Sequence, residues 1–166
     1  MDVKQPDGFP ELLLAVIEIQ KGSRNKYEFD HDSGLIKLNR VLYSAVHYPA
    51  EYGFIPGTRA EDGDEVDIMV LIEEPTFPGC LIEAKPIGML KLEDEKGGDN
   101  KILAVPVDDP RWNQVSQLSQ VPHHLLHEIE QFFLTYKILE DKGTTSSGWA
   151  FREETLGYIT ECRLAD

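Results

Sequence analysis

The residues with the clearest capacity for chemistry lie in the stretch EDGDEVD, residues 61–67, directly before the apolar run IMVLI. Five of its seven side chains are carboxylates: Glu61, Asp62, Asp64, Glu65 and Asp67. Like charges at this spacing repel one another unless water screens them or a cation lies among them. Carboxylate oxygens suit hard divalent cations such as Mg²⁺. The stretch is therefore either a solvated acidic turn or part of a metal site.

Two common motifs come close to matching and fail. A calcium loop starting at Asp62 would need glycine at its sixth position, where Asp67 stands, and an oxygen ligand at its fifth, where Val66 stands. The segment GTTSSGWA, residues 143–150, has the glycine spacing of a phosphate loop but lacks its lysine and its following Ser or Thr. The acidic stretch must therefore be interpreted together with other polar residues.

Such residues occur within the segments that alternate like strands and at the turns between them: Glu18, Lys26, Glu28, Arg40, Tyr48, Tyr52, Asp94, Glu95, Asp99 and Lys101. Each has a purely structural alternative, because charged side chains usually occupy the exposed face of a strand. In a two-residue hairpin, Asp94 would lie opposite Lys101 and Asp99 opposite Lys96, as plain cross-strand ion pairs. Only the joint occurrence of these residues favours one common site.

Composition narrows the possible partners. The chain has 166 residues, with 16 Lys and Arg against 30 Asp and Glu, and a formal charge of −14. This charge argues against nucleic acid or an anionic membrane as the main partner. The two cysteines are too few for a disulfide framework, and the apolar run at 12–17 is too short for a signal peptide or a membrane span. A cytoplasmic protein with a single domain, residues 1–166, is expected.

The elements that must position these residues follow from hydrophobic periodicity. Strands are expected over residues 12–19, 26–30, 34–42, 66–72, 80–95 and 100–107. Pro86 and Gly88 interrupt the longest of them, which indicates a bulge or a barrel corner. The segment YPAEYGFIPG, residues 48–57, is interpreted as a turn, and KGGD, residues 96–99, as a hairpin turn.

Helical spacing of apolar residues begins after Pro122 and predicts a helix that ends at Gly143, followed by a weaker helix over 152–164. Strands followed by one or two helices predict an α+β domain built around a small antiparallel barrel. In a straight strand, Asp62 and Asp64 would point away from Asp67, so a turn at Gly63 is needed to bring the three carboxylates together.

The order of these blocks is similar to that of the family I soluble inorganic pyrophosphatases of the prokaryotic type. The matching blocks, between about residues 16 and 142, are IEI, NKYEFD, LNRVLYSAVHYPAEYGFIPGT, EDGDEVDIMVL, PIGMLKLEDEKGGDNKILAVP and FFLTYK. The most specific part is the aspartate signature D-G-D-x-x-D at residues 62–67. The resemblance implies a five-stranded OB-like antiparallel β-barrel with flanking helices, and magnesium-dependent hydrolysis of pyrophosphate to two phosphates by a metal-activated water.

The resemblance also implies a role for each matching residue. The metal ligands would be Asp62, Asp67, Asp94, Asp99 and Glu28. The catalytic residues would be Asp64 as general base, with Glu18, Tyr52 and Lys101. The phosphates would be held by Lys26, Arg40, Tyr52, Lys101, Tyr136 and Lys137. Three residues, Tyr48, Glu95 and also Glu18, would surround and support these ligands and phosphate-binding residues. A homo-oligomer, a hexamer by family analogy, is a further expectation of this resemblance.

The assigned carboxylates outnumber the assigned Lys and Arg residues, so the site would repel a polyanion unless divalent cations reverse its sign. An all-oxygen ligand set selects several Mg²⁺ ions, with Mn²⁺ as a possible substitute. Glu51 and Glu65, which replace the usual Asn and Pro, are expected to add negative charge near the mouth. Two alternatives stay open: a larger phosphoanhydride substrate such as a nucleotide, and an OB-like binding module with a solvated acidic turn.

Overall fold

Five strands pair into a closed ring in the computed structural model, which describes residues 3–165. They are β1 (Leu13–Ile19), β4 (Glu51–Ile55), β5 (Val66–Val70), β6 (Leu81–Asp94) and β8 (Lys101–Pro106). They pair in the order β1-β4-β5-β8-β6, and the start of β6 pairs back with β1. The α+β, OB-like architecture is thereby confirmed. One detail was wrong: β5 and β8 pair in parallel, because the chain reverses through β6 between them.

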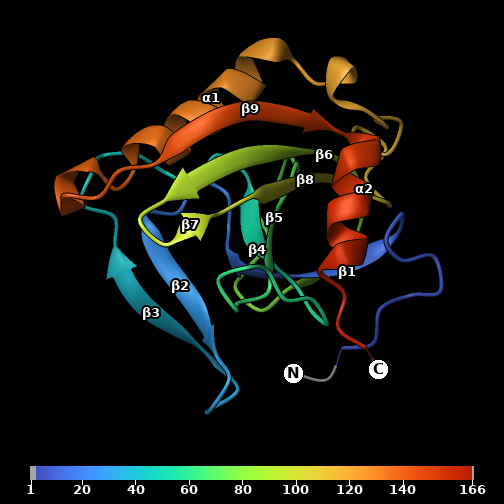
Figure 1. Cartoon of the computed structure of the whole chain (residues 1–166), viewed down its shortest axis with the longest axis horizontal. Helices are drawn as coiled ribbons and strands as arrows, with labels where there is room; N and C mark the ends of the chain where they lie inside the picture. The colour runs from blue at the N-terminus through green and yellow to red at the C-terminus, as the bar shows by residue number, and fades with distance from the viewer. Residues whose placement is uncertain (1–2, 166) are drawn as a thin grey trace.

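The other elements surround this ring. They are β2 (Asn25–Asp30), β3 (Leu35–Val41), β7 (Gly97–Gly98), β9 (Thr145–Phe151), α1 (His123–Thr135), α2 (Arg152–Glu161) and two 3₁₀ turns, η1 (Leu118–Gln120) and η2 (Ile138–Glu140). Strands β2 and β3 form a separate two-stranded sheet that projects from the ring, whereas α1 runs along one side of it beside β9 (Figure 1).

The segment at 48–57, interpreted from the sequence as a turn, contains the buried strand β4. The prolines and glycines of this segment are typical of turns, but Gly53 lies inside the strand, where a larger residue would not fit. A Cβ atom at Gly53 would lie 1.8 Å from the carbonyl oxygen of Val16 on the neighbouring strand. Glycine inside a strand commonly marks such a close approach of two backbones. Gly53 therefore allows β1 and β4 to pair with the curvature that closes the ring.

Replacing Gly53 with alanine is expected to destabilise the protein by roughly 4 kcal/mol or more, because the added methyl group collides with backbone rather than with a side chain that could rotate. Urea denaturation followed by circular dichroism measures this loss. Gly143→Ala is the matched control, since a Cβ atom there meets nothing within 4 Å. Equal stability of the two variants would show that the contact with Val16 does not constrain the ring.

The C-terminal third also differs from the expected pattern. The helix after Pro122 ends at Thr135 rather than near Gly143, and the chain continues as η2, which stops at Asp141 with a left-handed φ of 58°. Residues 143–150, considered above as a phosphate loop, belong mostly to β9, which pairs with the second half of β6. Helix α2 ends at Glu161, three residues before the expected end. Long-range pairing with β6 outweighs the local turn signals of the Ser- and Gly-rich segment.

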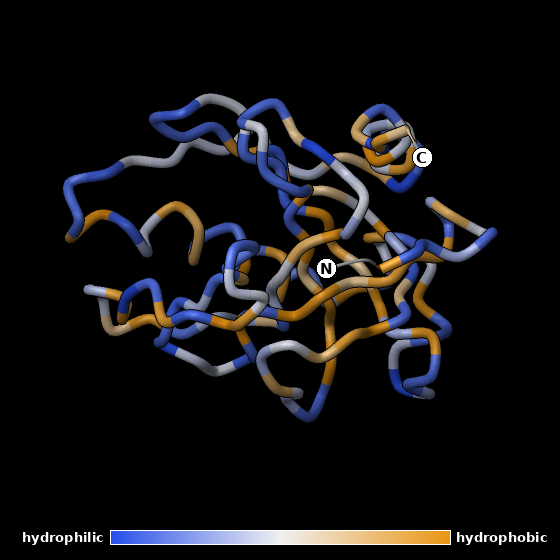
Figure 2. The backbone as a smooth tube through the Cα atoms, turned by 90° about the horizontal axis from the view of Figure 1, so that it is seen from below, coloured by the Kyte–Doolittle hydropathy of each residue, from blue (hydrophilic) through white to orange (hydrophobic). Residues whose placement is uncertain are grey.

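The predicted bulge is confirmed, since the register of β6 against β8 shifts between Pro86 and Gly88. Side chains that point to opposite faces of the strands belong to two different buried clusters. Ile68 belongs to one cluster, together with Ile159 of α2, and Met69 belongs to the other, together with Phe132 and Phe133 of α1. Apolar segments accordingly lie at the centre of the molecule and hydrophilic loops at its edge (Figure 2). Over residues 3–165, no helix has the length and apolar character needed to cross a membrane.

Candidate active site

One pocket of about 520 Å³ collects the polar residues singled out from the sequence. All of the expected catalytic, substrate-binding and metal-binding residues line it: Glu18, Lys26, Glu28, Arg40, Tyr52, Asp62, Asp64, Asp67, Asp94, Asp99, Lys101, Tyr136 and Lys137. They come from the strand ring, from the β2–β3 hairpin, from the loop before β5 and from the segment after α1. The fold therefore brings together residues that are far apart in sequence.

The acidic loop turns at Gly63, whose φ of +95° is accessible to glycine and rarely to other residues. Two hydrogen bonds fix the turn. The Asp64 amide donates to Asp62 Oδ1 at 3.1 Å, and the Ala60 amide donates to the Asp64 carbonyl at 2.8 Å. This is the turn that the sequence required, and it places the carboxylates of Asp62 and Asp64 at the same pocket as that of Asp67.

A lysine ammonium group lies at the centre of the pocket. Lys101 Nζ is 2.5 Å from Asp67 Oδ2 and 2.5 Å from Asp99 Oδ1. The parallel register of β5 and β8 places Lys101 beside Asp67, and the rings of Tyr52 and Phe133 lie under the ammonium, with centroids at 5.6 and 5.7 Å. Burial alone would lower the pKa of Lys101, but the two carboxylates outweigh burial and raise it. Lys101 is therefore a permanently charged, buried cation.

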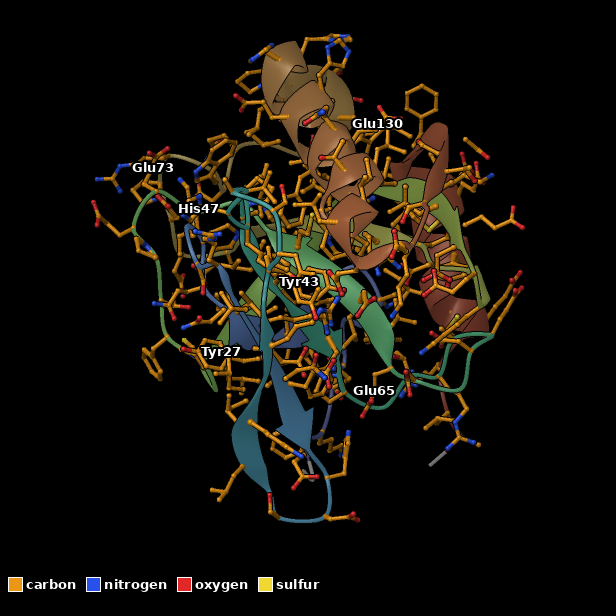
Figure 3. The ribbon with its side chains drawn as sticks, turned by 90° about the vertical axis from the view of Figure 1, so that its left-hand side faces the viewer. Tyr27, Tyr43, His47, Glu65, Glu73 and Glu130 are labelled. Carbon is orange, nitrogen blue, oxygen red and sulfur yellow. The ribbon has the colours of Figure 1, made fainter. Side chains whose placement is uncertain are left out.

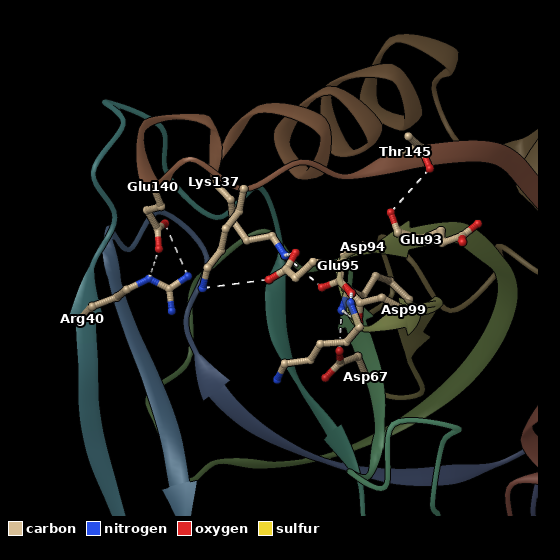
Figure 4. Close-up of polar contacts among 12 residues, drawn as sticks. Arg40, Asp67, Glu93, Asp94, Glu95, Asp99, Lys137, Glu140 and Thr145 are labelled. Atoms are coloured by element: carbon tan, nitrogen blue, oxygen red, sulfur yellow. Dashed lines mark hydrogen bonds and ion pairs between the residues drawn. The ribbon is translucent and has the colours of Figure 1, made fainter.

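A second lysine fixes the opposite wall. Lys137 Nζ donates to Asp94 Oδ2 at 2.9 Å and lies 3.5 Å from Glu95 Oε2 (Figure 4). Burial by itself would raise the pKa of Asp94, but the hydrogen bonds from Lys137 and from the Lys96 amide, together with the charges of Lys137 and Lys101, lower it. The simple hairpin interpretation was wrong, since Lys101 aligns with Leu90 rather than Asp94 and bonds to Asp99. Asp94 and Asp99 thus belong to the pocket rather than to a surface ladder.

The remaining wall is the β2–β3 hairpin with the end of β1. Lys26 Nζ donates to Glu28 Oε1 at 2.5 Å, and the side chains of both residues line the pocket. Glu18 accepts a 2.6 Å hydrogen bond from the Phe29 amide, which joins β1 to the hairpin. Burial raises the pKa of Glu18 to about 7, although the Phe29 amide opposes that rise. Glu18 is therefore a carboxyl group that titrates near neutral pH in the metal-free protein.

Glu18→Gln is expected to change how stability depends on pH. Because the pKa of Glu18 is about 7 in the folded chain and ordinarily 4.5, its burial costs nothing below pH 4.5 and increasingly more as pH rises through 7. In chelator, the variant should therefore gain stability over the native chain between pH 5 and pH 8, by about 3 kcal/mol at most. Urea titrations at both pH values measure the difference, with the exposed Glu153→Gln as control. A difference that does not depend on pH would contradict this assignment.

Among the remaining expectations, only the one for Glu51 is contradicted by the structure. Glu51 is fully buried and does not line the pocket. Its carboxylate accepts hydrogen bonds from the Lys21 amide and from the amide and hydroxyl of Thr76. Tyr48 does not line the pocket but packs against Tyr52, with ring centroids 5.3 Å apart. Glu65 does line it, on the loop beside the hairpin (Figure 3), and lies 3.3 Å from His31 Nε2.

Several pocket residues were not among the predicted site residues: His31, Asn39, Lys96 and Lys142. His31 and Asn39 belong to the β2–β3 hairpin and its turn, where the strand alternation could have indicated them. Lys96 adjoins the acidic pair at 94–95, but the sequence analysis considered it only as a cross-strand partner of Asp99. Lys142 follows η2, in a region that the sequence analysis assigned to the end of a long helix. Nothing in the sequence pattern there indicated that its side chain would reach the pocket.

The donor set fits hard divalent cations. Nine carboxylates line the pocket against six Lys and Arg residues. The other polar side chains at the pocket are two tyrosines, Asn39 and His31. Within residues 3–165, no three Asp, Glu, His or Cys side chains converge on one point that could hold an ion. Instead, lysine ammonium groups occupy the positions between the carboxylates. These lysines offset only part of the negative charge of the pocket, because its carboxylates outnumber its Lys and Arg residues.

This arrangement, with surplus carboxylates, fixed lysines and tyrosine hydroxyls around one hollow, suits a compact phosphorylated anion that is held partly through hard cations. Comparisons with known proteins agree. A family model described as inorganic pyrophosphatase matches residues 15–165. An inorganic pyrophosphatase of Methanosarcina mazei is 51% identical over 153 residues, covering 92% of this chain and 90% of that protein. One from Synechocystis sp. is 48% identical over 164 residues, covering 98% and 97%.

The solved structures agree as well. The crystal structure of inorganic pyrophosphatase from Thermus thermophilus superposes with a TM-score of 0.94 at 43% identity, covering 97% of this chain and 94% of that one. The chain therefore belongs to the inorganic pyrophosphatase family. The resemblance noted in the sequence is confirmed, and with it the class of enzyme, a phosphoanhydride hydrolase.

Proposed function

We propose that the protein hydrolyses inorganic pyrophosphate to two phosphates in a reaction that requires Mg²⁺ and uses a water molecule as nucleophile. The observation that carries the proposal is the Lys101 ammonium between Asp67 and Asp99, inside a pocket whose other lysines and arginine come from three separate segments. A pyrophosphate needs several cations around it, and the family of the chain supplies the reaction class. Mn²⁺ is a possible substitute, since it accepts the same oxygen ligands.

The metal ligands we propose are Asp62, Asp67, Asp94, Asp99 and Glu28, all of them at the pocket. When bound, Mg²⁺ ions would neutralise the phosphates and lower the pKa of a coordinated water. The protein's part is to hold its carboxylates at the pocket before the ions arrive. The turn at Gly63 does this for Asp62, and the paired strands β5 and β8 do it for Asp67.

Asp64 is the proposed general base. Its backbone amide is tied to Asp62 Oδ1, so the loop holds its position, while neither an ion pair nor a side-chain hydrogen bond engages its carboxylate within residues 3–165. That carboxylate is therefore free to accept the proton of a water attacking phosphorus. Glu18, half-buried at the base of the hairpin, accepts a hydrogen bond from the Phe29 amide and so keeps the hairpin against β1.

The phosphates are assigned to Lys26, Arg40, Lys101 and Lys137, with Tyr52 and Tyr136. Lysine and arginine offset the charge that develops on the departing phosphate, and arginine can bind two oxygens at once. Burial raises the pKa of both tyrosines, which therefore stay protonated as hydrogen-bond donors. The donors are fixed in place before substrate binds, as electrostatic stabilisation of a transition state requires.

Asp64→Asn is expected to lower kcat by roughly 10²- to 10⁴-fold, because the amide cannot accept the proton from water. Metal binding should change little, since the side chain is not a proposed ligand. Phosphate release gives kcat, and the rise of melting temperature with added Mg²⁺ reports binding to the folded chain. Loss of the Mg²⁺ effect in this variant would show that Asp64 is a metal ligand instead of a base.

Substrate choice is tested by comparing pyrophosphate with ATP at equal Mg²⁺ concentration. The account predicts far faster phosphate release from pyrophosphate; equal rates would favour a nucleotide phosphohydrolase. The hexamer and the cytoplasmic location expected from the resemblance stay predictions, and analytical ultracentrifugation would test the first.

A further inference from the structure

Glu140 contacts the pocket arginine from outside the pocket. It lies in η2, one turn after Lys137, and does not itself line the pocket. Its Oε1 lies 2.8 Å from Arg40 Nε as an ion pair, and its Oε2 accepts a hydrogen bond from Arg40 Nη2 at 3.4 Å (Figure 4). The Glu140 side chain is only 8% exposed and that of Arg40 24%. The pair is thus shielded from water much more than the exposed pair of Lys91 and Glu154.

This contact fixes the direction in which the guanidinium group points. Glu140 lies along the edge formed by Nε and Nη2, where Nη2 makes the hydrogen bond and Nε only the ion-pair contact, and Nη1 donates to Asn39 Oδ1 at 2.9 Å. Both Nη atoms keep one further hydrogen, because each carries two. These remaining hydrogens form the end of the planar fork that can bind two phosphate oxygens. Glu140 therefore holds Arg40 by one edge and leaves its opposite end available.

The contact also attaches the β2–β3 hairpin, which has little stability of its own, to the body of the protein. The β2–β3 hairpin is a separate two-stranded sheet, and every residue in it is at least partly exposed. Such a hairpin is barely stable in water by itself. Strand β2 is held to β1 through Phe29 and Glu18. Strand β3 continues into the buried Leu42, and its Arg40 side chain reaches Glu140, which is 100 residues away in sequence. The hairpin carries Lys26, Glu28 and Arg40, so its position determines one wall of the site.

We infer that Glu140 is a positioning residue, which orients Arg40 toward the substrate phosphates and holds β3 against the segment that carries Lys137. This inference deepens the proposed function and rests on it. Charge alone predicts the opposite effect: removing the Glu140 carboxylate adds net positive charge beside the pocket and would favour a polyanionic substrate. Positioning and simple electrostatics can therefore be separated by the sign of the change.

The test compares Glu140→Gln, Glu140→Asp and the native chain in phosphate release from Mg-pyrophosphate. Glu140→Gln should lower kcat/KM roughly tenfold, mainly through a higher KM, although it adds positive charge. Glu140→Asp, which keeps the charge but shortens the reach, should also lower it. Glu154→Gln, the same change in the exposed pair with Lys91 outside the pocket, should leave kcat/KM within about twofold. An unchanged or raised kcat/KM in Glu140→Gln would overturn the inference.

Two further measurements complete the test. In an Arg40→Ala background, Glu140→Gln should change kcat/KM less than twofold, because its target is gone; a full tenfold loss would overturn action through Arg40. Hydrogen exchange of the amides at 35–41 should become several-fold faster in Glu140→Gln than in Glu154→Gln. Exchange does not depend on turnover. If the native chain released no phosphate, the proposed function would fail, while unchanged exchange would separately refute the attachment of β3.

Discussion

Replacing Asp67 with asparagine is expected to reduce pyrophosphate hydrolysis by at least 10³-fold. Asp67 opens β5 at the pocket and is the carboxylate that shares the buried Lys101 ammonium with Asp99. Asparagine keeps the shape and one oxygen but carries no charge, and an uncharged amide is a poor ligand for Mg²⁺ compared with a carboxylate. The loss should combine weaker metal binding with poorer placement of Lys101. Phosphate release at saturating Mg²⁺ measures it.

The matched control for this prediction is Asp108→Asn, an exposed aspartate outside the pocket, which should keep native activity. The comparison with Asp64→Asn is equally informative. Asp67→Asn should weaken the stabilisation of the folded chain by Mg²⁺, whereas Asp64→Asn should preserve it. Identical metal affinity in Asp67→Asn and the native chain would contradict the role of Asp67 as a ligand.

Replacing Lys101 with methionine should affect stability and activity together. The Lys101 side chain is 3% exposed and its ammonium pairs with two carboxylates, so its removal leaves Asp67 and Asp99 without the lysine that they share. Breaking a buried pair in this way costs about 3–5 kcal/mol. At this chain length, that corresponds to a melting temperature lower by about 6–20 °C in chelator. Activity should fall by roughly 10²- to 10³-fold, because the variant lacks a proposed donor to the phosphates.

Magnesium distinguishes this explanation from general damage to the core. In the native chain an ion must displace the Lys101 ammonium from the carboxylates, whereas in Lys101→Met it meets no such competitor. Added Mg²⁺ should therefore raise the melting temperature of the variant more than that of the native chain. Lys91→Met, which removes an exposed partner of Glu154, is the control and should change stability by less than about 1 kcal/mol. An equal Mg²⁺ effect in both chains would contradict the competition.

Local patterns were sufficient for much of the fold. The alternation at 26–30, the helical spacing after Pro122 and the interruption at Pro86 and Gly88 each correspond to an observed element. The requirement for a turn at Gly63 was also visible, because side-chain direction alternates along a strand. These features depend on residues close together in sequence, so local physical chemistry determines them.

Other features depend on partners far along the chain, which no local pattern contains. Gly53 is needed because Val16 approaches it, and without that neighbour YPAEYGFIPG resembles a turn. Glu51 looks like surface charge until Thr76 encloses it with hydrogen bonds. Glu140 carries no signal of its own, since its partner Arg40 is 100 residues away. The same reasoning explains why the alternative of plain ion pairs across the 96–99 turn was wrong, because Lys137 from another element binds Asp94.

The central claim is that Mg²⁺ bound by these carboxylates enables the chain to hydrolyse pyrophosphate. The most direct measurement is phosphate released from pyrophosphate by the purified protein, first with excess chelator and then with Mg²⁺ added back in excess. The account predicts no release above background in chelator, and rapid release of two phosphates per pyrophosphate once Mg²⁺ is restored. Release that continues at the same rate in chelator, or none after Mg²⁺ is restored, would contradict it.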